Sequence, residues 1–164
     1  NYAWKKFCLS HSLSTRLRLH YSLGFLRSTD MRITLDQYKN IPFAERGRDY
    51  NGVDCWGLIY LIHREQLGNS VPAYSESYCT TKDGEEIAAL IRAERIQSWG
   101  EIQPPHAVAG DIVVLRILGE PWHCGIMLDK TRFAHMERNV GIIQDSIESL
   151  RWSKRIEGFY RWQP

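Results

Sequence analysis

The sequence has no long hydrophobic segment. None of its apolar runs approaches the ~20 residues that a transmembrane helix needs, and residues 1–30 lack the apolar centre of a secretory signal. Internal repeats and low-complexity linkers are also absent. At 164 residues the chain is long enough to bury a hydrophobic core without covalent cross-links. We therefore predict one small globular domain with no membrane span.

Cysteine is scarce, and the few cysteines are not spaced as metal ligands. The four cysteines include no Cys-x-x-Cys pair, and the six histidines show no His-x-x-x-His spacing, which argues against the common zinc motifs. If one cysteine must stay free, the other three cannot form a complete set of disulfides. We expect neither a metal nor a cofactor. Three of the cysteines are interpreted as buried or incidental thiols: Cys8, Cys79 and Cys124.

No excess of one charge marks the main part of the chain. The formal net charge is +2, but residues 1–30 carry five Lys and Arg against one acid, which leaves 16 bases and 18 acids from Met31 onward. The body of the protein is therefore not a nucleic-acid binder by charge. Residues 1–30 are interpreted as an extension outside the domain, which begins at Met31 and continues with a Thr34-x-x-Gln37 capping-box pattern. The predicted domain is thus residues 31–164.

The most informative residue is Cys55, which stands where a helix is expected to begin. Residues 56–67 carry apolar side chains at helical spacing, and Gly68 follows as a typical helix stop. Asp54 is the predicted N-cap, so Cys55 falls at the first helical position, beside unpaired backbone N–H groups that favour a thiolate. The Asp54 carboxylate opposes that charge, so a nearby cation is needed. Alternatively, Cys55 is a small apolar residue that packs one end of a buried helix.

Two later histidines can supply this cation. After Gly110, short segments rich in β-branched, aliphatic and aromatic residues predict an antiparallel meander with strands at 111–117, 123–128, 132–136, 141–145 and 155–162. His123 and His135 lie on successive strands. With a two-residue loop at 129–130 they point to opposite faces, whereas with a three-residue loop at 129–131 they share one face as diagonal neighbours.

The sequence leaves three interpretations of the two histidines open. If they share a face, one can act as a base and the other can orient it. Each is otherwise a half-buried strand residue whose ring is satisfied by the backbone. A metal site formed with Cys55 is a further alternative.

Two segments lie between the helix that begins at Cys55 and the meander. Residues 84–98 form a predicted second helix with apolar residues on one stripe, capped by Asp83 and Glu86. Residues 71–82 are polar and aromatic, and they form either a wall of a substrate cleft or an ordinary surface loop. The predicted fold class is α+β, with helices first and an antiparallel sheet that carries the histidines.

The motifs around these residues resemble the NlpC-type branch of the papain-like cysteine peptidases. The similarity covers residues 31 to about 162 and rests on Asp54-Cys55-Trp56-Gly57-Leu58, Ala109-Gly110-Asp111-Ile112-Val113, His123-Cys124-Gly125-Ile126-Met127-Leu128 and Phe133-Ala134-His135. The resemblance implies a papain-like domain that hydrolyses peptidoglycan stem peptides, usually at the amide after D-glutamate. It also implies that Cys55 is the nucleophile, His123 the base and His135 the orienting residue.

Further similarities indicate one group within this family. Trp56, Pro42-Phe43 and Gly47-Arg48-Asp49 most resemble members that are encoded in phage tail operons. On this resemblance the protein acts at a virion tail or at the bacterial cell envelope. It would be made in the bacterial cytoplasm without a signal peptide, and phage tail-tip proteins are its implied partners besides the stem peptide.

Three residues depart from the family pattern. Ala109 replaces a proline, Cys124 replaces an aliphatic residue, and Phe43 stands where many members have a tyrosine near the oxyanion site. The first two are interpreted as packing variants, and alternation along the strand predicts that Cys124 points away from the site. The third matters more, because losing one oxyanion donor costs about 100- to 1,000-fold in rate. Tyr50, in the loop before Cys55, is an alternative donor.

The predicted function is therefore a cysteine endopeptidase acting on peptidoglycan. Its oxyanion or substrate contacts are predicted to come from the Cys55 backbone N–H and from Phe43, Tyr50, Asp54 and Trp56. Two alternatives stay open. One is a weakly active or inactive structural tail-tip component, which Phe43 favours. The other is a thiol amidase or acyltransferase, because the nucleophile does not choose between water and another acceptor.

Overall fold

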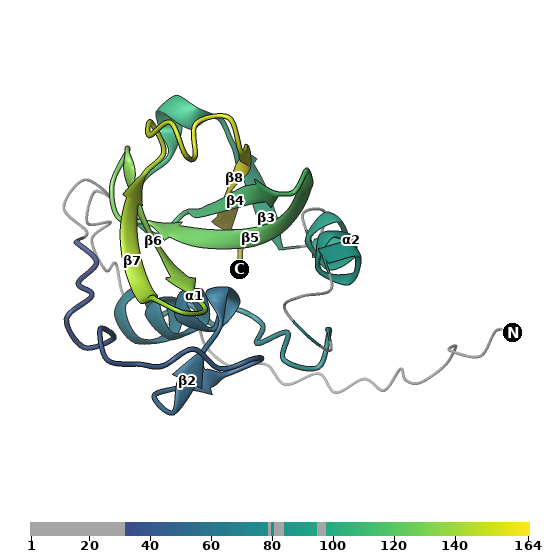
Figure 1. Cartoon of the computed structure of the whole chain (residues 1–164). Helices are drawn as coiled ribbons and strands as arrows, with labels where there is room; N and C mark the ends of the chain where they lie inside the picture. The colour runs from purple at the N-terminus through teal and green to yellow at the C-terminus, as the bar shows by residue number, and fades with distance from the viewer. Residues whose placement is uncertain (1–31, 79, 81–83, 95–97) are drawn as a thin grey trace, which may run out of the picture. The chain divides into compact units, whose positions relative to one another are not determined.

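The computed structural model describes residues 32–78, 80, 84–94 and 98–164, so the predicted extension at residues 1–30 lies outside the described residues. Figure 1 shows a curved sheet with helices packed beside it. None of the described helices is long and apolar enough to span a membrane. In chain order the elements are β1 (Arg48–Asp49), β2 (Gly52–Val53), α1 (Cys55–Ile62), the π-helical turn η1 (His63–Leu67), α2 (Gly84–Glu94), β3 (Trp99–Ile102), the 3-10 turn η2 (Pro104–His106), β4 (Ile112–Ile117), β5 (Glu120–Met127), β6 (Arg132–Glu137), β7 (Gly141–Ser146) and β8 (Ile156–Trp162).

The segment that precedes β1 is turned rather than helical. Residues 36–40 form turns, so the capping-box pattern at Thr34 does not begin a helix. The Gln66 side chain explains this, because it accepts a hydrogen bond from the Thr34 N–H (3.0 Å) and donates one to the Thr34 carbonyl oxygen (2.8 Å). A partner distant in sequence thus takes the groups that a local cap would use.

The helix predicted from the apolar spacing after Cys55 is present. Asp54 is its N-cap, with extended backbone, and the Asp54 Oδ1 atom accepts a hydrogen bond from the Gly57 N–H at 2.8 Å. The helix continues into η1 and ends at Gly68, whose φ of 67° is the left-handed conformation that glycine adopts most easily. Both predicted ends are confirmed, and Cys55 is held at the first helical position.

The second predicted helix is also present, with a shorter described length. α2 ends at Glu94, while Asp83 and residues 95–97 lie outside the described residues and Ser98 belongs to a turn. Ile87 and Ala88 are buried, and α2 packs beside β5. The predicted apolar stripe therefore contributes to the core.

The main sheet is antiparallel and has the strand order β3-β8-β4-β5-β6-β7. The predicted meander is confirmed for β4 to β7 but is wrong for the last strand, because β8 pairs with β4 instead of β7. Residues 147–155 carry the chain back between these strands, anchored by the buried Trp152. The sequence analysis also missed β3, a four-residue strand that pairs with β8.

The β5–β6 hairpin has the three-residue loop that places the two histidines on one face. The Leu128 N–H donates to the Arg132 carbonyl oxygen (2.8 Å), and Ile126 lies opposite Ala134. The Asp129 side chain closes the loop, because its Oδ1 atom accepts from the N–H groups of Thr131 and Arg132 at 2.9 and 2.7 Å. Of the two loop lengths considered, the structure selects the odd one.

Gly125 allows the two strands of this hairpin to approach closely. A Cβ atom at this position would lie 2.7 Å from Cδ2 of Phe133, 2.8 Å from the carbonyl oxygen of Ala134 and 3.3 Å from Cβ of His135. The first two distances are shorter than real Cβ contacts. The absence of a side chain therefore brings His135 beside the strand that carries His123.

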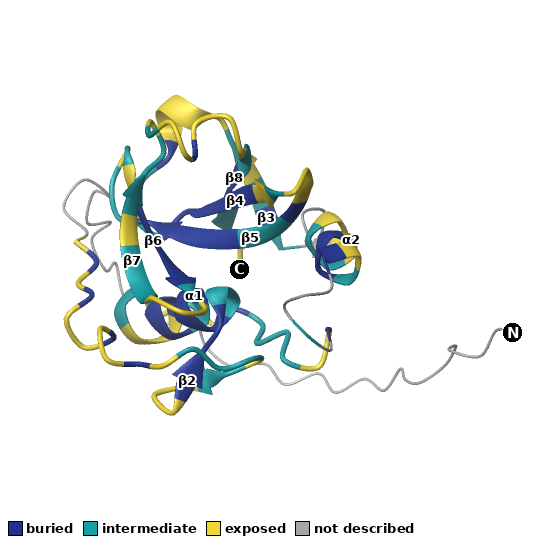
Figure 2. Cartoon of the chain, viewed as in Figure 1, coloured by how far each residue is buried: buried dark blue, intermediate teal, exposed yellow. Residues whose placement is uncertain are grey.

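Figure 2 shows buried residues along β4, β5 and β6 and in α1, and the core they form divides into two clusters. On one face, α1 packs against even-numbered strand residues, among them Ile112, Val114, Cys124, Ile126 and Ala134. On the other face, odd-numbered residues surround Trp152, among them Val113, Leu115, Met127, Phe133 and Phe159. Strand alternation thus assigns each face its own cluster.

Candidate active site

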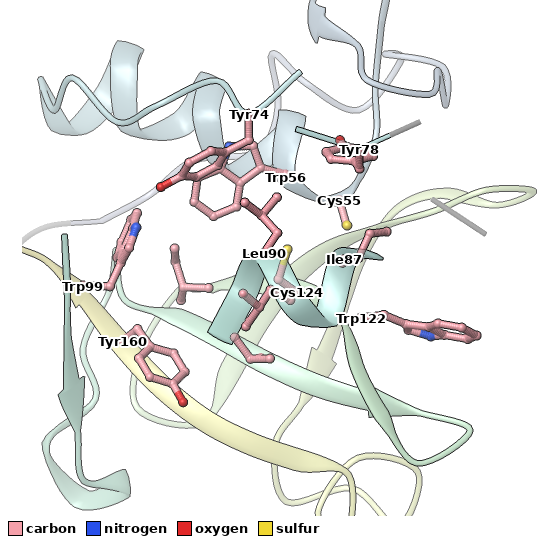
Figure 3. Close-up of a pocket in the computed structure, with 13 residues that line it drawn as sticks. Cys55, Trp56, Tyr74, Tyr78, Ile87, Leu90, Trp99, Trp122, Cys124 and Tyr160 are labelled. Carbon is pink, nitrogen blue, oxygen red and sulfur yellow. The ribbon is translucent and has the colours of Figure 1, made fainter. Parts of the chain in front are cut away.

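Cys55 lies between two pockets on either side of its thiol. One, here called the apolar pocket, is lined almost wholly by apolar atoms of residues that include Trp56, Tyr74, Trp99 and Leu90 (Figure 3). The other, here called the charged cleft, is lined by residues that include Phe43, His123, Arg138 and Arg151. Cys55 and Trp122 line both. Cys55 and Trp122 therefore stand at the boundary between the two pockets.

The two histidines form a hydrogen-bonded chain. Nε2 of His123 lies 2.9 Å from Nδ1 of His135, with the rings nearly perpendicular at 81°. Nε2 of His135 lies 3.2 Å from Oδ2 of Asp145, and the indole N–H of Trp152 donates to the same oxygen at 2.7 Å. The predicted pairing of His123 with His135 is confirmed in geometry, and Asp145 and Trp152 extend it.

The carboxylate at the end of this chain sets the proton positions along it. An ionised Asp145 can only accept, so Nε2 of His135 carries the proton and Nδ1 of His135 is an acceptor. Nε2–H of His123 must then donate to His135, which leaves Nδ1 of His123 for Cys55. The chain thus aims one particular nitrogen of His123 at the thiol.

The surroundings favour a thiolate at Cys55. A hydrogen bond from the Cys124 thiol lowers the pKa of Cys55 well below its usual value, burial opposes this, and His123 acts in the same direction as Cys124. Burial would raise the pKa of Asp145, but hydrogen bonds from Trp152 and His135 outweigh it, so the pKa of Asp145 is lowered. The two imidazoles therefore lie between the Asp145 carboxylate and the Cys55 thiolate.

Cys124 does not point away from the site, and that prediction is wrong. Alternation along β5 does separate it from His123, but α1 packs on the face that carries Cys124 and Ile126. Cys55, at the start of α1, therefore contacts the side chains of both His123 and Cys124. The error came from assuming that the helix covers the face of the histidines.

Asp54 is buried within the fold and does not face a ligand. Its carboxylate is fully buried and accepts hydrogen bonds from Arg48 at 2.8 Å, from the Arg46 N–H at 2.9 Å and from the Tyr78 hydroxyl. Burial raises the pKa of Asp54, the charge of Cys55 adds to this, and Arg48 opposes it. Its role as N-cap is therefore joined to a buried ion pair that ties β1 to α1.

The other predicted oxyanion and substrate residues differ in position. Phe43 lines the charged cleft with Cys55, and the Arg138 guanidinium lies 4.4 Å from the centre of its ring. Trp56 lines the apolar pocket, but its indole N–H donates to the Pro72 carbonyl oxygen. The structure does not bring Tyr50 to Cys55: the Tyr50 hydroxyl donates to Glu65 at 2.7 Å, near the far end of the helix.

Sequence reasoning missed Asp145 and Trp152, and it left the role of Tyr78 open. Tyr74 and Tyr78 both line the apolar pocket, which favours the cleft-wall interpretation of their segment. The position of Asp145 could have been predicted from strand pairing, because the β6–β7 register places Phe133 opposite Asp145 and His135 opposite Ile143. The same parity argument that joins the histidines also puts Asp145 diagonal to His135. Trp152 had no such signal, since it lies in a connection rather than a strand.

Within the described residues, no cluster of three or more His, Cys, Asp and Glu side chains is arranged to hold a metal ion. The site is instead a thiol beside a chain of imidazoles, at the N-terminus of a helix packed on an antiparallel sheet. The sequence model described as the NlpC/P60 family matches residues 40–161. The chain belongs to the NlpC/P60 family.

Relatives in the NlpC/P60 family support this assignment. The chain is 25% identical over 136 residues to proteins named murein DD-endopeptidase MepS/murein LD-carboxypeptidase in three strains of Escherichia coli, covering 80% of this chain. It spans 63% of the length of these relatives. Two solved structures share the fold. One is a Staphylococcus aureus protein described as similar to a lipoprotein of the NLP/P60 family, with 22% identity, a TM-score of 0.53 and coverage of 78% of this chain and 38% of that one.

The second solved structure is the NlpC/p60 domain of the peptidoglycan hydrolase SagA. It matches with 16% identity and a TM-score of 0.51, and the alignment covers 76% of this chain and 90% of that domain. The predicted α+β papain-like fold is therefore confirmed, with the helix that begins at Cys55 packed on the antiparallel sheet.

Replacing Asp145 tests whether it positions His135. We expect Asp145→Ala to lower kcat by about 10- to 100-fold with little change in KM, because an unanchored His135 no longer fixes the proton on His123. Asp145→Asn should lose less, since an amide oxygen can still accept from both His135 and Trp152. Steady-state kinetics of the two variants decide this. An Asp145→Ala enzyme with unchanged kcat would contradict the role.

Acid should destabilise the fold through two buried histidines. Burial lowers the pKa of both His63 and His135 from 6.5 to about 4. Between these values the unfolded chain binds more protons than the folded one, so stability present above pH 6.5 is lost as the pH falls toward 4. Each histidine accounts for up to about 3 kcal/mol of this loss.

Urea unfolding at about pH 7 and about pH 4.5 measures this acid-induced loss of stability. The variant His135→Gln removes one of the two titrating rings, so it should show about half of the wild-type loss. An identical pH dependence in wild type and variant would contradict the assignment to His135.

Proposed function

We propose that this protein is a cysteine endopeptidase that hydrolyses amide bonds in peptidoglycan stem peptides. The observation that carries the proposal is the chain from Asp145 through His135 to His123, which leaves Nδ1 of His123 for the thiol at the start of α1. This is the nucleophile, base and orienting group that thiol-dependent acyl transfer requires. The names of the murein-acting relatives support the substrate class.

The mechanism follows from these positions. The Cys55 thiolate attacks the carbonyl carbon of the scissile amide, and the C–N bond breaks as Nδ1–H of His123 donates its proton to the leaving amine. Water then attacks the thioester with His123 as the base, which releases the acid and restores the thiol. The backbone N–H of Cys55, free at the first helical position, is one donor to the oxyanion. His135 keeps the imidazole of His123 in the required orientation.

The setting that we propose is a phage tail or a prophage, with action at the cell envelope. Its support is the resemblance of Trp56, Pro42-Phe43 and Gly47-Arg48-Asp49 to members from phage tail operons. Tail-tip proteins are then the proposed partners. Co-purification of the chain with a tail-tip complex from induced lysates tests this setting, and a chain found only in cell-envelope fractions without phage proteins would contradict it.

Digestion of purified peptidoglycan tests the proposed reaction. We expect mass spectrometry of the soluble products to find new amino and carboxyl termini, in equal amounts, inside the stem peptide. A transferase would instead join the stem peptide to an added amine acceptor, and a structural component would release nothing. Either result would contradict the endopeptidase proposal.

A weakly active tail-tip component is the second candidate, and Phe43 is the observation that favours it. Phe43 lines the charged cleft beside Cys55 and has no hydroxyl to offer an oxyanion. If backbone N–H groups alone hold the developing charge, Phe43→Tyr should raise kcat by up to the order of 100-fold. Kinetics on a stem-peptide substrate measure the effect.

The matched control for this variant is Tyr50→Phe. Because the Tyr50 hydroxyl donates to Glu65, its removal should leave the rate unchanged. A slow Tyr50→Phe enzyme together with an unchanged Phe43→Tyr enzyme would show that Tyr50 supplies the donor after all. If neither substitution changes kcat, a tyrosine hydroxyl reaches the oxyanion from neither position.

A further inference from the structure

Two free thiols meet beside the apolar pocket. Cys55 is half-buried, Cys124 is buried, and both line this pocket. Figure 3 shows both sulfur atoms at the wall of this pocket, and a hydrogen bond joins the two side chains. In the proposed hydrolysis Cys124 only donates a hydrogen bond to the Cys55 thiolate, so the reactivity of its own sulfur is not used.

We propose that Cys124 is a resolving cysteine: after a hydroperoxide oxidises Cys55, Cys124 closes a reversible Cys55–Cys124 disulfide that protects the nucleophile from irreversible oxidation. The reagent class is hydrogen peroxide or a small organic hydroperoxide. The inference stands on the contact of the two thiols and does not depend on which bond the enzyme cuts.

The chemistry balances in two steps. The Cys55 thiolate attacks one oxygen of hydrogen peroxide, an S–O bond forms as the O–O bond breaks, and the departing hydroxide takes a proton from His123 to leave as water. The sulfur of Cys124 then attacks the sulfenic acid, an S–S bond forms as the S–O bond breaks, and the Cys124 proton leaves with hydroxide as a second water. Two thiols are oxidised to one disulfide, and one peroxide is reduced to two waters.

The environments of the two sulfurs fix the order of these steps. Cys55 has the lowered pKa of a thiol that peroxide attacks first, and it lines both the apolar pocket and the charged cleft. The pKa of Cys124 is raised well above its usual value, first by its hydrogen bond to Cys55 and then by burial. Oxidation makes Cys55 a neutral sulfenic acid, which removes the negative charge that holds the proton on Cys124. The resolving thiol is thus activated only after the first oxidation.

Mass spectrometry tests the proposal without any substrate. In a full-length Cys8→Ser, Cys79→Ser background, which removes the other two thiols, a few equivalents of hydrogen peroxide should give a product that has lost two hydrogen atoms. Its peptide map should contain the peptides of Cys55 and Cys124 joined, and dithiothreitol should restore both thiols. Absence of the joined peptide while Cys55 becomes oxidised would overturn the proposal.

Cys124→Val and Cys124→Ser in the same background are the matched controls. Neither can close the disulfide, so Cys55 should pass to the sulfinic acid, and recovery of its thiol with dithiothreitol should fall at least tenfold below that of the Cys124 protein. Thermal unfolding checks that each variant is folded. Equal recovery with and without Cys124 would overturn the proposal, and if Cys124→Val fails to fold, Cys124→Ser and the peptide map still decide.

Discussion

Cys55→Ala should abolish turnover of cell-wall fragments and leave the fold intact. In the proposed mechanism the thiolate forms the covalent intermediate, so its removal should lower kcat on the order of 10⁴-fold or more. The fold should tolerate the change because Asp54 caps the start of α1 and Gly68 ends the η1 turn that continues it, so neither boundary depends on the sulfur. Release of soluble muropeptides from purified peptidoglycan measures the loss.

Thermal unfolding is the control for this variant. A midpoint within a few degrees of wild type shows that the lost activity reflects chemistry and not unfolding. The Cys55→Ala protein should also still bind peptidoglycan, since the walls of the apolar pocket and the charged cleft are intact. A variant that keeps full activity would end the cysteine-peptidase proposal.

His123→Ala should be nearly as damaging, whereas changes at His135 should be graded. Loss of the base removes both the proton that the leaving amine needs and the cation beside the thiolate, at a cost of about 1,000-fold or more. His135→Asn and His135→Gln should retain part of the activity, about 10- to 100-fold below wild type, because an orienting residue needs only an acceptor for Nε2–H of His123.

The pH profile separates the roles of the two histidines. An orienting change at His135 should lower kcat and leave KM unchanged, while the rate of Cys55 alkylation should keep its rise near the same pH. In His123→Ala that rise should shift to higher pH, because the thiolate has lost its cation. Equal loss of activity in His135→Gln and His123→Ala would make His135 a second base and contradict the assignment.

The nucleophile helix and the histidine hairpin were predictable because local rules decide them. Asp54 before an apolar helical repeat predicts a cap, and Gly68 after it predicts a stop. The loop at residues 129–131 was left between two lengths, and the structure shows that the Asp129 side chain bonds two following N–H groups. This Asx turn, which aspartate forms as readily as asparagine, was a readable signal in the sequence for the three-residue loop.

The rest of the site depends on contacts between distant segments, which no local pattern contains. The ring of Tyr50, in the β1–β2 turn, stacks on Tyr38, and its hydroxyl donates a hydrogen bond to Glu65 instead of reaching the oxyanion site. Cys124 meets Cys55 because α1 covers one particular face of the sheet. β8 returns to β4 because Trp152 is buried in the connection before it. Each outcome was decided by tertiary packing, where single-residue preferences are weak.

The pairing of the two histidines on this hairpin requires glycine at position 125. The hydrogen bond between the two imidazoles forms where β5 and β6 approach each other closely. A side chain at residue 125 would not fit between the two strands at this distance. A single added methyl group at residue 125 would press against the carbonyl oxygen of Ala134 and the ring of Phe133, so β5 and β6 would have to shift apart beside His135. The proposed reaction therefore depends on a residue that has no side chain and takes no part in the chemistry.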